Sequence, residues 1–460
     1  MKTFKKILCV VLCLLTLTST MVFAGAANET ADELTSITQD DFLTVKGRKI
    51  VNQKGETVQL RGVNLGAWLV RENWLNPDCI DVEYKSKMTE EQQKKYWGTF
   101  YEDLTAEEKA IFDPYYKKDY DGEMIYDVLE KRFGREKAQE LLNMFYDNWI
   151  TEWDLDNIKS MGFNCVRVPF WYRNFYYDDK GTKILDENGD WDFSRLDWVV
   201  EKCAEKGLYV ILDMHGAVGS QSDAPHSGRA FKGAQLMENS EQGEEYRRLT
   251  DELWTAIASR FEGNPAVAMY DLLNEPMCDV QCGELTRRIK NEAIYTRLYN
   301  TVRAVDEEHI ITMEAIWTGF ALPKTFLKGW KDVVYQVHFY NNSDFIFNFF
   351  LLLTMAIHPN VPLMVGEFYP HEKTTWNNCF STMNKLGYSW MCWTYKATGD
   401  KMWKSDWCMY GAKNGFSRAK IFHGTYDEIA AAWSAERLNT NGEWFVNTGH
   451  YDNNVKDHLG

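Results

Sequence analysis

Apolar stretches recur along the chain, and each ends at a polar or aromatic residue before an amphipathic helical pattern begins. The stretches are nearly continuous in apolar residues, which is typical of strands buried on both faces, whereas strict alternation would predict a half-exposed sheet. They occupy residues 59–65, 163–168, 209–213, 266–273, 310–314, 333–338, 363–367 and 388–393. Eight strand and helix units in this order predict an α/β fold, a closed parallel TIM (β/α)8 barrel.

Two segments near the amino-terminal end depart from this repeat. Residues 43–60 contain short β-rich stretches separated by glycine-containing turns, which predicts an N-terminal β-hairpin. Residues 77–134 are charged and rich in tyrosine, and we interpret them as a helical insertion after strand 1. Such an insertion either walls off one end of a cleft or forms a surface subdomain. Helices are expected over residues 90–96, 106–112 and 136–150, and over 426–437 before a polar tail.

The first residues have a different character from the barrel. A basic start, an apolar run over residues 7–17 and the small residues Ala24 to Ala26 predict a secretory signal peptide, residues 1–26, cleaved near Ala24 to Ala26. The run is too short to span a bilayer, which takes about 20 residues. We expect a disordered acidic leader over residues 27–41 and a single barrel domain over 42–460. The mature protein is therefore expected to be secreted, without stable membrane insertion.

Charge and residue counts narrow the class of partner. A formal net charge of -16 argues against nucleic acid and anionic membrane, because both are polyanions that require basic patches. A neutral substrate fits better, and flat sugar faces would stack on the abundant aromatic rings, although large cores also use tryptophan. Histidines without paired ligand spacing argue against a metal hydrolase, and no Gly-x-Ser-x-Gly elbow or phosphate loop is found, so no cofactor is implied. Cys278 and Cys282 form the only close cysteine pair outside the signal peptide, and such a pair can be bridged in an exported protein.

Polar residues close the predicted strands. Barrel enzymes carry their reactive groups at the carboxyl ends of the strands, so these residues are candidates for a site. Each has a structural explanation when taken alone: Arg167 suits an ion pair, and His338 suits a satisfied core histidine. Their recurrence at one end of successive strands favours a site, because a purely structural end needs few buried polar groups. The candidates are Glu72, Arg167, His215, Asn274, Glu275, His338, Tyr340, Glu367 and Trp393.

Glu275 and Glu367 close strands four and seven, so we expect them to face each other across the barrel mouth. Glycosidic bond cleavage needs such a pair: one acid protonates the leaving oxygen and one carboxylate attacks the anomeric carbon, about 5 to 5.5 Å apart in retaining enzymes. We assign Glu275 as general acid/base, with a pKa raised by burial and like charge. We assign Glu367 as nucleophile, kept ionised by Arg167 or Tyr340. Asn274, beside the acid, suits the sugar 2-hydroxyl.

The motifs at these strand ends occur together in a known family. The chain resembles glycoside hydrolase family 5 (clan A) from about residue 62 to 407, in register with all eight strands. It is most similar to the exo-β-1,3-glucanase (glucan 1,3-β-glucosidase) branch, through residues 61–70 followed by Glu72, residues 149–154 and the histidine loop 213–221. The motifs in family order are Arg167-Val168-Pro169, Asn274-Glu275-Pro276, His338-Phe339-Tyr340, Gly366-Glu367-Phe368 and Trp393.

The resemblance implies a retaining β-glycosidase acting on a β-glucan, with exo-β-1,3 action favoured. It also implies that Glu72 binds hydroxyls of the terminal sugar. Three alternatives stay open. A β-1,4-endoglucanase is suggested by residues 339–342, and an endoglycoceramidase-like activity by the apolar residues 345–357, which we interpret instead as a buried helix. A non-catalytic carbohydrate-binding barrel is the third, although binding alone does not need both glutamates.

Overall fold

The computed structural model describes residues 35–72, 74–79, 82–83, 99–100, 105–106, 109, 122–229, 232–315, 319–370, 372–398 and 408–459. The predicted signal peptide and residues 27–34 of the predicted leader lie outside the described residues. So do the predicted helix 90–96 and, apart from Ala106 and Lys109, the predicted helix 106–112. These four expectations therefore stay predictions.

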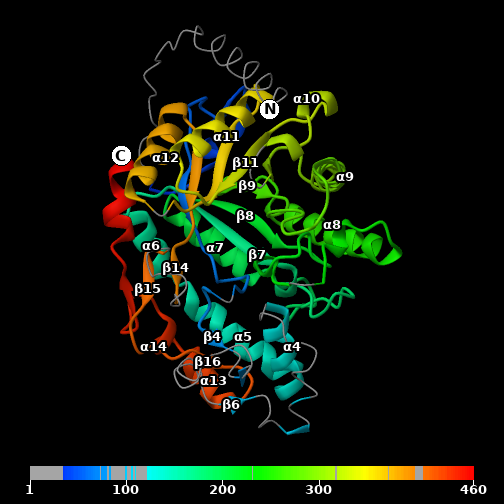
Figure 1. The fold of residues 1–460 in the computed structure, drawn as a ribbon, viewed down its shortest axis with the longest axis vertical. Helices are drawn as coiled ribbons and strands as arrows, with labels where there is room; N and C mark the ends of the chain where they lie inside the picture. The colour runs from blue at the N-terminus through cyan, green and yellow to red at the C-terminus, as the bar shows by residue number, and fades with distance from the viewer. Residues whose placement is uncertain are drawn as a thin grey trace, which may run out of the picture.

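Within the described residues, eight parallel strands close into a barrel (Figure 1). They follow one another around the barrel in the order in which they occur along the chain, and the last strand pairs with the first. The strands are β3 (Arg61–Asn64), β7 (Cys165–Trp171), β8 (Tyr209–Gly216), β9 (Val267–Asp271), β10 (Ile310–Glu314), β11 (Val333–Phe339), β12 (Leu363–Phe368) and β13 (Ser389–Cys392). Each coincides with a predicted apolar stretch, so the predicted (β/α)8 barrel is confirmed.

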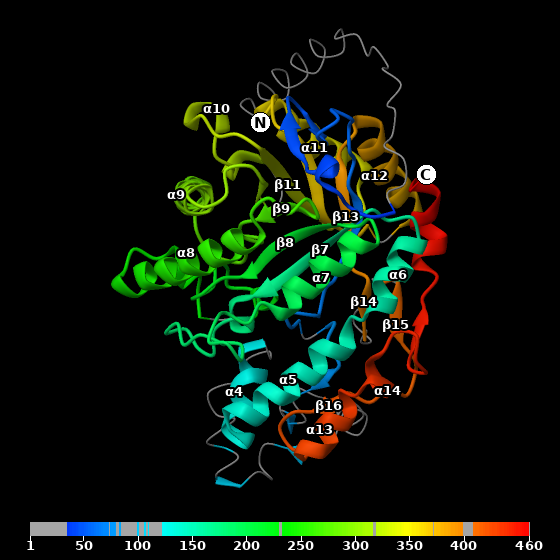
Figure 2. The ribbon, with the colours of Figure 1, turned by 180° about the vertical axis from the view of Figure 1, so that it is seen from behind.

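Helices connect successive strands and cover the outside of the barrel (Figures 1 and 2). They are α6 (Glu152–Ser160), α7 (Ser194–Glu205), α8 (Glu241–Phe261), α9 (Glu284–Arg303), α10 (Thr325–Lys328), α11 (Asp344–Ile357) and α12 (Lys373–Leu386). The longest, α8, begins after Ser240, whose hydroxyl accepts a 3.0 Å hydrogen bond from the Gly243 N–H. This is the usual way in which a serine stabilises the free N–H groups of a helix start.

The amino-terminal hairpin closes one end of the barrel. Strands β1 (Thr44–Lys46) and β2 (Lys49–Val51) pair antiparallel, as predicted. Leu43 and Ile50 from this segment are buried with Cys165 and Tyr209, which begin β7 and β8. Because this apolar cluster seals the amino ends of the strands, a site has to be sought at the carboxyl ends.

The folded part begins earlier than the predicted boundary at residue 42. Ile37 donates its N–H to the Ala204 carbonyl at 2.8 Å. Residues Gln39–Asp41 form a 3-10 turn, and the Tyr209 hydroxyl donates to the Asp41 carbonyl at 2.9 Å. The end of the predicted leader is therefore anchored, through contacts with residues far along the chain that composition alone does not reveal.

The segment after residue 408 is more structured than predicted. The single helix expected over residues 426–437 is two helices, α13 (Tyr426–Ala432) and α14 (Ala435–Leu438). Trp433 lies between them and is fully buried. Its ring packs against that of Phe145, with centroids 5.7 Å apart, so the chain turns toward the interior at this residue. The expected polar tail contributes β17 (Phe445–Asn447), which joins β14 (Lys396–Ala397) and β15 (Tyr410–Ala412) in a small sheet.

A lobe of helices lies beside the carboxyl end of the barrel, in the lower part of Figures 1 and 2. It contains α4 (Gly122–Phe133), α5 (Arg135–Trp149), which matches the predicted helix 136–150, and the C-terminal helices α13 and α14. Glu123 at the start of α4 donates its N–H to the Gly228 carbonyl, in the loop after β8, at 2.9 Å. The described end of the predicted insertion therefore contacts a loop that emerges from the carboxyl ends of the strands.

The predicted buried helix over residues 345–357 forms as α11, but most of it is not buried. Only Phe347, Leu351 and Thr354 are buried, and Phe345 is 76% exposed. The helix is apolar on its outer face as well, which the argument from one buried face did not anticipate. Within the described ranges, no helix combines the length and the apolar character needed to cross a membrane.

Candidate active site

The predicted site residues converge at the carboxyl end of the barrel. Arg167 lies within β7, and His215, His338 and Glu367 lie near the carboxyl ends of β8, β11 and β12. The other members follow strands: Glu72 after β3, Asn274 and Glu275 after β9, Tyr340 after β11 and Trp393 after β13. Hydrogen bonds, ring contacts and electrostatic interactions link all nine into one cluster.

Arg167 is the centre of this cluster and is completely buried. Burial alone would lower the pKa of its guanidinium, but the surrounding carboxylates raise it, so the cation is retained. Its contacts are Glu367 Oε1 at 2.8 Å, Asp271 Oδ2 at 2.9 Å, Asn274 Oδ1 at 2.9 Å, Asn64 Oδ1 at 3.0 Å and Asp213 Oδ2 at 3.0 Å. One guanidinium therefore fixes residues from four strands and one loop.

Both carboxylate oxygens of Glu367 are held by donors. Arg167 contacts Oε1, and the Tyr340 hydroxyl donates to Oε2 at 2.6 Å. The preceding Gly366 permits this placement, because a Cβ there would lie 1.8 Å from Gln336 Oε1. A charge-assisted contact and a short hydroxyl bond therefore fix the orientation of the Glu367 carboxylate.

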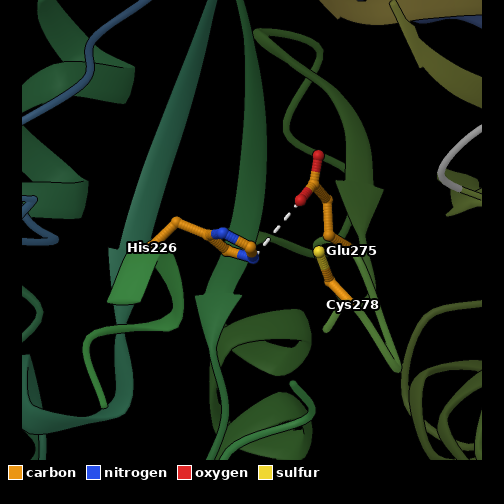
Figure 3. A group of neighbouring side chains, drawn as sticks. All are labelled: His226, Glu275 and Cys278. Atoms are coloured by element: carbon orange, nitrogen blue, oxygen red, sulfur yellow. Dashed lines mark ion pairs between the residues drawn. The ribbon is translucent and has the colours of Figure 1, made fainter. Parts of the chain in front are cut away.

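Glu275 has an uncommon backbone conformation and two histidine neighbours. Its φ of 41° lies in the left-handed region, which residues other than glycine adopt mainly where the surroundings require it. Its backbone N–H donates to the Glu314 carboxylate. The Oε1 atom of its carboxylate lies 2.8 Å from His338 Nδ1. The Oε2 atom lies 3.3 Å from His226 Nε2 (Figure 3). The two oxygens therefore have different partners.

The pKa shifts in this cluster differ from those expected from the sequence. Burial alone would lower the pKa of His338, but Glu314 and Glu367 raise it to about 9. Burial also raises the pKa of Glu314. Burial alone would raise the pKa of Glu275, but the contacts with His226 and His338 outweigh burial and lower this pKa. The predicted raised pKa of Glu275 is thus wrong for the free protein, because His226, which lies in a loop, could not be read from strand ends.

His215 and Asn274 form a fixed chain of hydrogen bonds. Burial lowers the pKa of His215 to about 3, so its ring is neutral. His215 Nδ1 lies 2.6 Å from Asp213 Oδ2, and the Asn274 amide nitrogen lies 3.3 Å from His215 Nε2. Because the Asn274 oxygen accepts from Arg167, its amide nitrogen donates to Nε2, and Nδ1 therefore carries the ring proton.

Glu72 and Trp393 form two further walls of the cluster. Glu72 is 2% exposed, and its Oε1 accepts no hydrogen bond from the described residues. Burial, Glu367 and Glu275 raise the pKa of Glu72. Trp393 stacks on His215 with ring centroids 5.6 Å apart and planes inclined by 13°. The cluster therefore includes an acceptor without a protein partner and a rigidly held aromatic ring.

Several residues of the cluster were not among the predicted site residues. Asp213 and Glu314 close two of the predicted strands, so the strand-end criterion could have selected both. Asp271 closes β9, three residues before the predicted Asn274. His226 lies in a loop without hydrophobic periodicity, and no pattern in the sequence points to it.

Two groups of side chains bring potential metal ligands within 4.8 Å of one another. One contains Glu275, Glu314 and His338. The raised pKa of His338 keeps its ring protonated, so a positive charge already lies between the two carboxylates. The other contains His226, Glu275 and Cys278. The structure has Cys278 and Cys282 as free thiols, so the bridge considered from the sequence is not formed.

Comparisons with known proteins place the chain among glycosidases. Residues 133–399, more than half of the chain, match the model of the family described as Cellulase (glycosyl hydrolase family 5). A beta-xylosidase from Phanerodontia chrysosporium is 29% identical over 66% of this chain and 53% of its own length. A glucan 1,3-beta-glucosidase from Candida oleophila is 26% identical over 62% of this chain and 59% of its own length. The chain thus spans little more than half of these curated relatives.

The fold is also shared with solved structures. The crystal structure of rutinosidase from Aspergillus niger matches with a TM-score of 0.51 at 14% sequence identity. The match covers 82% of this chain and 97% of that chain. At this level of identity the likeness concerns the fold alone.

Proposed function

Because the chain belongs to glycoside hydrolase family 5, we propose that it hydrolyses β-glucans as a retaining β-glycosidase, with Glu275 as general acid/base and Glu367 as nucleophile. The observation that carries this proposal is that one atom, Nδ1 of His338, lies close to the carboxylates of both glutamates. His338 Nδ1 lies 2.8 Å from Glu275 Oε1 and 3.4 Å from Glu367 Oε2. Two carboxylates meeting at the mouth of a barrel are what glycosidic bond cleavage requires.

The separation of the two glutamates supports retention of configuration. Since both oxygens lie so close to His338 Nδ1, they are no more than about 6 Å apart. Inverting enzymes keep their carboxyl groups about 6.5 to 9.5 Å apart to admit a water molecule, whereas retaining enzymes need about 5 to 5.5 Å. The arrangement is therefore suited to direct attack by one carboxylate on the anomeric carbon.

The neighbours of Glu367 support its role as nucleophile. Arg167 and Tyr340 each bond one oxygen, which limits the rotation of the carboxylate. Attack on the anomeric carbon forms the bond from a Glu367 oxygen and releases the aglycone oxygen. Preorganised donors of this kind lower the barrier because they need not reorient during the reaction.

The neighbours of Glu275 support its role as acid and then base. His338, with its pKa raised to about 9, holds a proton 2.8 Å from Glu275 Oε1. That hydrogen bond lets the proton reach the carboxylate when a leaving oxygen approaches, and Glu275 then passes it to that oxygen. In the second step the same carboxylate removes a proton from the water that attacks the glycosyl-enzyme bond.

We propose exo-β-1,3 action on the β-glucan. Glu72 offers an acceptor oxygen without a partner among the described residues, which suits a hydroxyl of a terminal sugar. Asn274 is fixed beside Glu275 by Arg167, as a contact to the 2-hydroxyl would need. Relatives named glucan 1,3-beta-glucosidase agree with this linkage.

Product analysis tests the proposal. The protein starting at residue 27 is incubated with laminarin, mixed-linkage glucan, carboxymethyl cellulose and xylo-oligosaccharides, and the anomeric configuration of early products is followed by NMR. We expect β-glucose from laminarin. Mixed oligosaccharides from the β-1,4-containing polymers would indicate an endoglucanase, and xylose a xylosidase. α-Glucose as first product would overturn retention, and no product from any substrate would favour a binding barrel.

We further propose that the protein is exported, on the basis of the signal-like residues 1–26. Expression of the full chain in a secreting host, followed by amino-terminal sequencing of the medium fraction, tests this. A chain in the medium beginning close to Ala26 is expected. A chain retained in the cells and beginning at Met1 would contradict export.

A further inference from the structure

A histidine, a glutamate and a cysteine meet on one side of the candidate site. Glu275 uses Oε1 toward His338 and presents Oε2 to His226, 3.3 Å away. Cys278, three residues after Glu275, places its sulfur so that the three potential ligand atoms lie within 4.8 Å of one another (Figure 3). The side of Glu275 away from His338 thus carries one nitrogen, one oxygen and one sulfur ligand.

The spacing of these atoms fits a tetrahedral metal ion. Nitrogen and oxygen ligands about 2.0 to 2.1 Å from zinc lie roughly 3.3 to 3.4 Å apart in a tetrahedral site. The separation of His226 Nε2 and Glu275 Oε2 is 3.3 Å. A sulfur ligand, about 2.3 Å from the ion, lies roughly 3.5 Å from the others. The Cys278 sulfur lies within 4.8 Å of both other ligand atoms, so binding requires it to move closer by at most about 1.3 Å.

Two further observations point to a ligand at this place. His226 Nε2 is buried and lies 3.3 Å from Glu275 Oε2, but the described residues give it no hydrogen bond of good geometry. Cys278 also lines a cavity of about 400 Å³ formed by the loop after β9 and the start of α9. The cavity thus borders the group of three side chains at Cys278.

We propose that His226, Glu275 and Cys278 bind a borderline or soft divalent cation such as Zn²⁺, and that the bound ion inhibits the enzyme. Mixed nitrogen and sulfur ligands select such ions over Mg²⁺ and Ca²⁺, which prefer oxygen. Binding forms a metal–thiolate bond and releases the Cys278 thiol proton to solvent. The ion binds Oε2 of Glu275, and its positive charge keeps the carboxylate ionised, so Glu275 can neither hold a proton for the leaving oxygen nor accept one from water.

Metal binding is tested first without reference to activity. The full chain is titrated with Co²⁺, and thiolate-to-cobalt charge-transfer absorption is recorded. Cys282→Ser is the matched control, because Cys282 is a half-buried cysteine of the same loop outside the cluster. We expect the absorption in the wild type and in Cys282→Ser, and its loss in Cys278→Ser. Equal absorption in Cys278→Ser would overturn the site.

Inhibition is tested next and rests on the proposed glycosidase activity. Hydrolysis of an aryl β-glucoside is measured against Zn²⁺, with each variant compared with its own metal-free rate. Cys278→Ser and His226→Ala should raise the inhibitory Zn²⁺ concentration at least about tenfold, as loss of metal-site residues does elsewhere, whereas Cys282→Ser should not. Unchanged inhibition in both variants, or equal inhibition by Mg²⁺, would contradict the proposal. Absence of all activity would refute the proposed function but leave the cobalt result standing.

Discussion

Glu275 and Glu367 carry the same side chain, and their neighbours distinguish their roles. Glu367 has a permanent cation and a hydroxyl on its two oxygens, and these contacts fix its orientation. Glu275 has two histidines instead, and the contacts with them lower its pKa. The differences between the two environments lead to three predictions for single residues.

Glu367→Ala should reduce hydrolysis of β-glucan by roughly 10⁴-fold or more, as expected when a member of a catalytic unit is lost. Added azide should restore turnover of an activated aryl glucoside and yield the α-glycosyl azide, because the small anion fills the space of the missing carboxylate. The product is identified by NMR. Natural turnover close to that of the wild type would remove Glu367 from the nucleophile role.

Glu275→Gln should slow the first step on laminari-oligosaccharides by roughly 10²- to 10⁴-fold, the usual contribution of general acid catalysis. The same step on a dinitrophenyl glucoside should be nearly unchanged, because this leaving group needs no proton. Rapid-mixing measurement of aglycone release compares the two. An equal loss on both substrates would show that Glu275 is not the acid.

The pKa of His338 should set the alkaline limit of activity. Glu314 and Glu367 raise it from 6.5 to about 9, so the proton beside Glu275 is present below pH 9 and lost above it. We expect kcat/KM to fall above about pH 9, whereas His338→Gln should have low activity without this fall. The stabilising charge of His338 is likewise complete below pH 6.5 and lost as pH rises through 9. A wild-type profile that falls near pH 6.5 would contradict the assignment.

The sequence predicts more of the residue-level site than of its electrostatics. Strand ends locate Glu275 and Glu367, because a parallel barrel brings the carboxyl ends of its strands together. His226 comes from a loop, whose path depends on packing that leaves no periodic signal. The direction of the Glu275 pKa shift followed from that unseen neighbour, and so was predicted with the wrong sign.

At the scale of elements, buried strands were predictable and short helices after the barrel were not. A strand such as β8 is buried along its whole length and begins with the apolar run from Tyr209 to Leu212, so the signal lies within the strand's own sequence. The break between α13 and α14 depends on Trp433, which is buried through Phe145 of α5, almost 300 residues earlier. Long-range packing therefore decided where this helix ends.

Trp433→Ala should destabilise the helical lobe by about 3 to 5 kcal/mol, because it removes a large, fully buried ring. Trp433 packs against Phe145 and lies under the Arg71 guanidinium, 4.9 Å away. Trp153→Ala is the matched control, because Trp153 is 37% exposed and should cost much less. Thermal unfolding compares the two. Equal losses in Tm would contradict the packing role of Trp433.

At the scale of the whole molecule, the chain segment after β13 ties the barrel to the lobe through a buried lysine. Lys396 is fully buried, and its ammonium donates to the Trp149 carbonyl at 2.8 Å and to the Leu438 carbonyl. It also lies 4.4 Å from the Trp149 ring and 4.2 Å from the Phe445 ring. Four elements, β14, α5, α14 and β17, therefore meet at the side-chain nitrogen of Lys396. Little negative charge lies near this nitrogen to balance a positive charge on it.

This lysine should make the stability of the whole molecule depend on pH. Burial lowers the pKa of Lys396 from 10.5 to about 7, so between these values the unfolded chain binds a proton that the folded chain does not. Stability from this group therefore rises with pH across that window, by roughly 2 kcal/mol between pH 7 and 9. Urea unfolding of the wild type and Lys396→Met at pH 7, 8 and 9 measures it. The free energy of unfolding of the wild type should rise relative to that of Lys396→Met as pH rises, because methionine does not titrate. Parallel curves for the two proteins would mean that Lys396 stays charged in the fold, held by its two carbonyl acceptors.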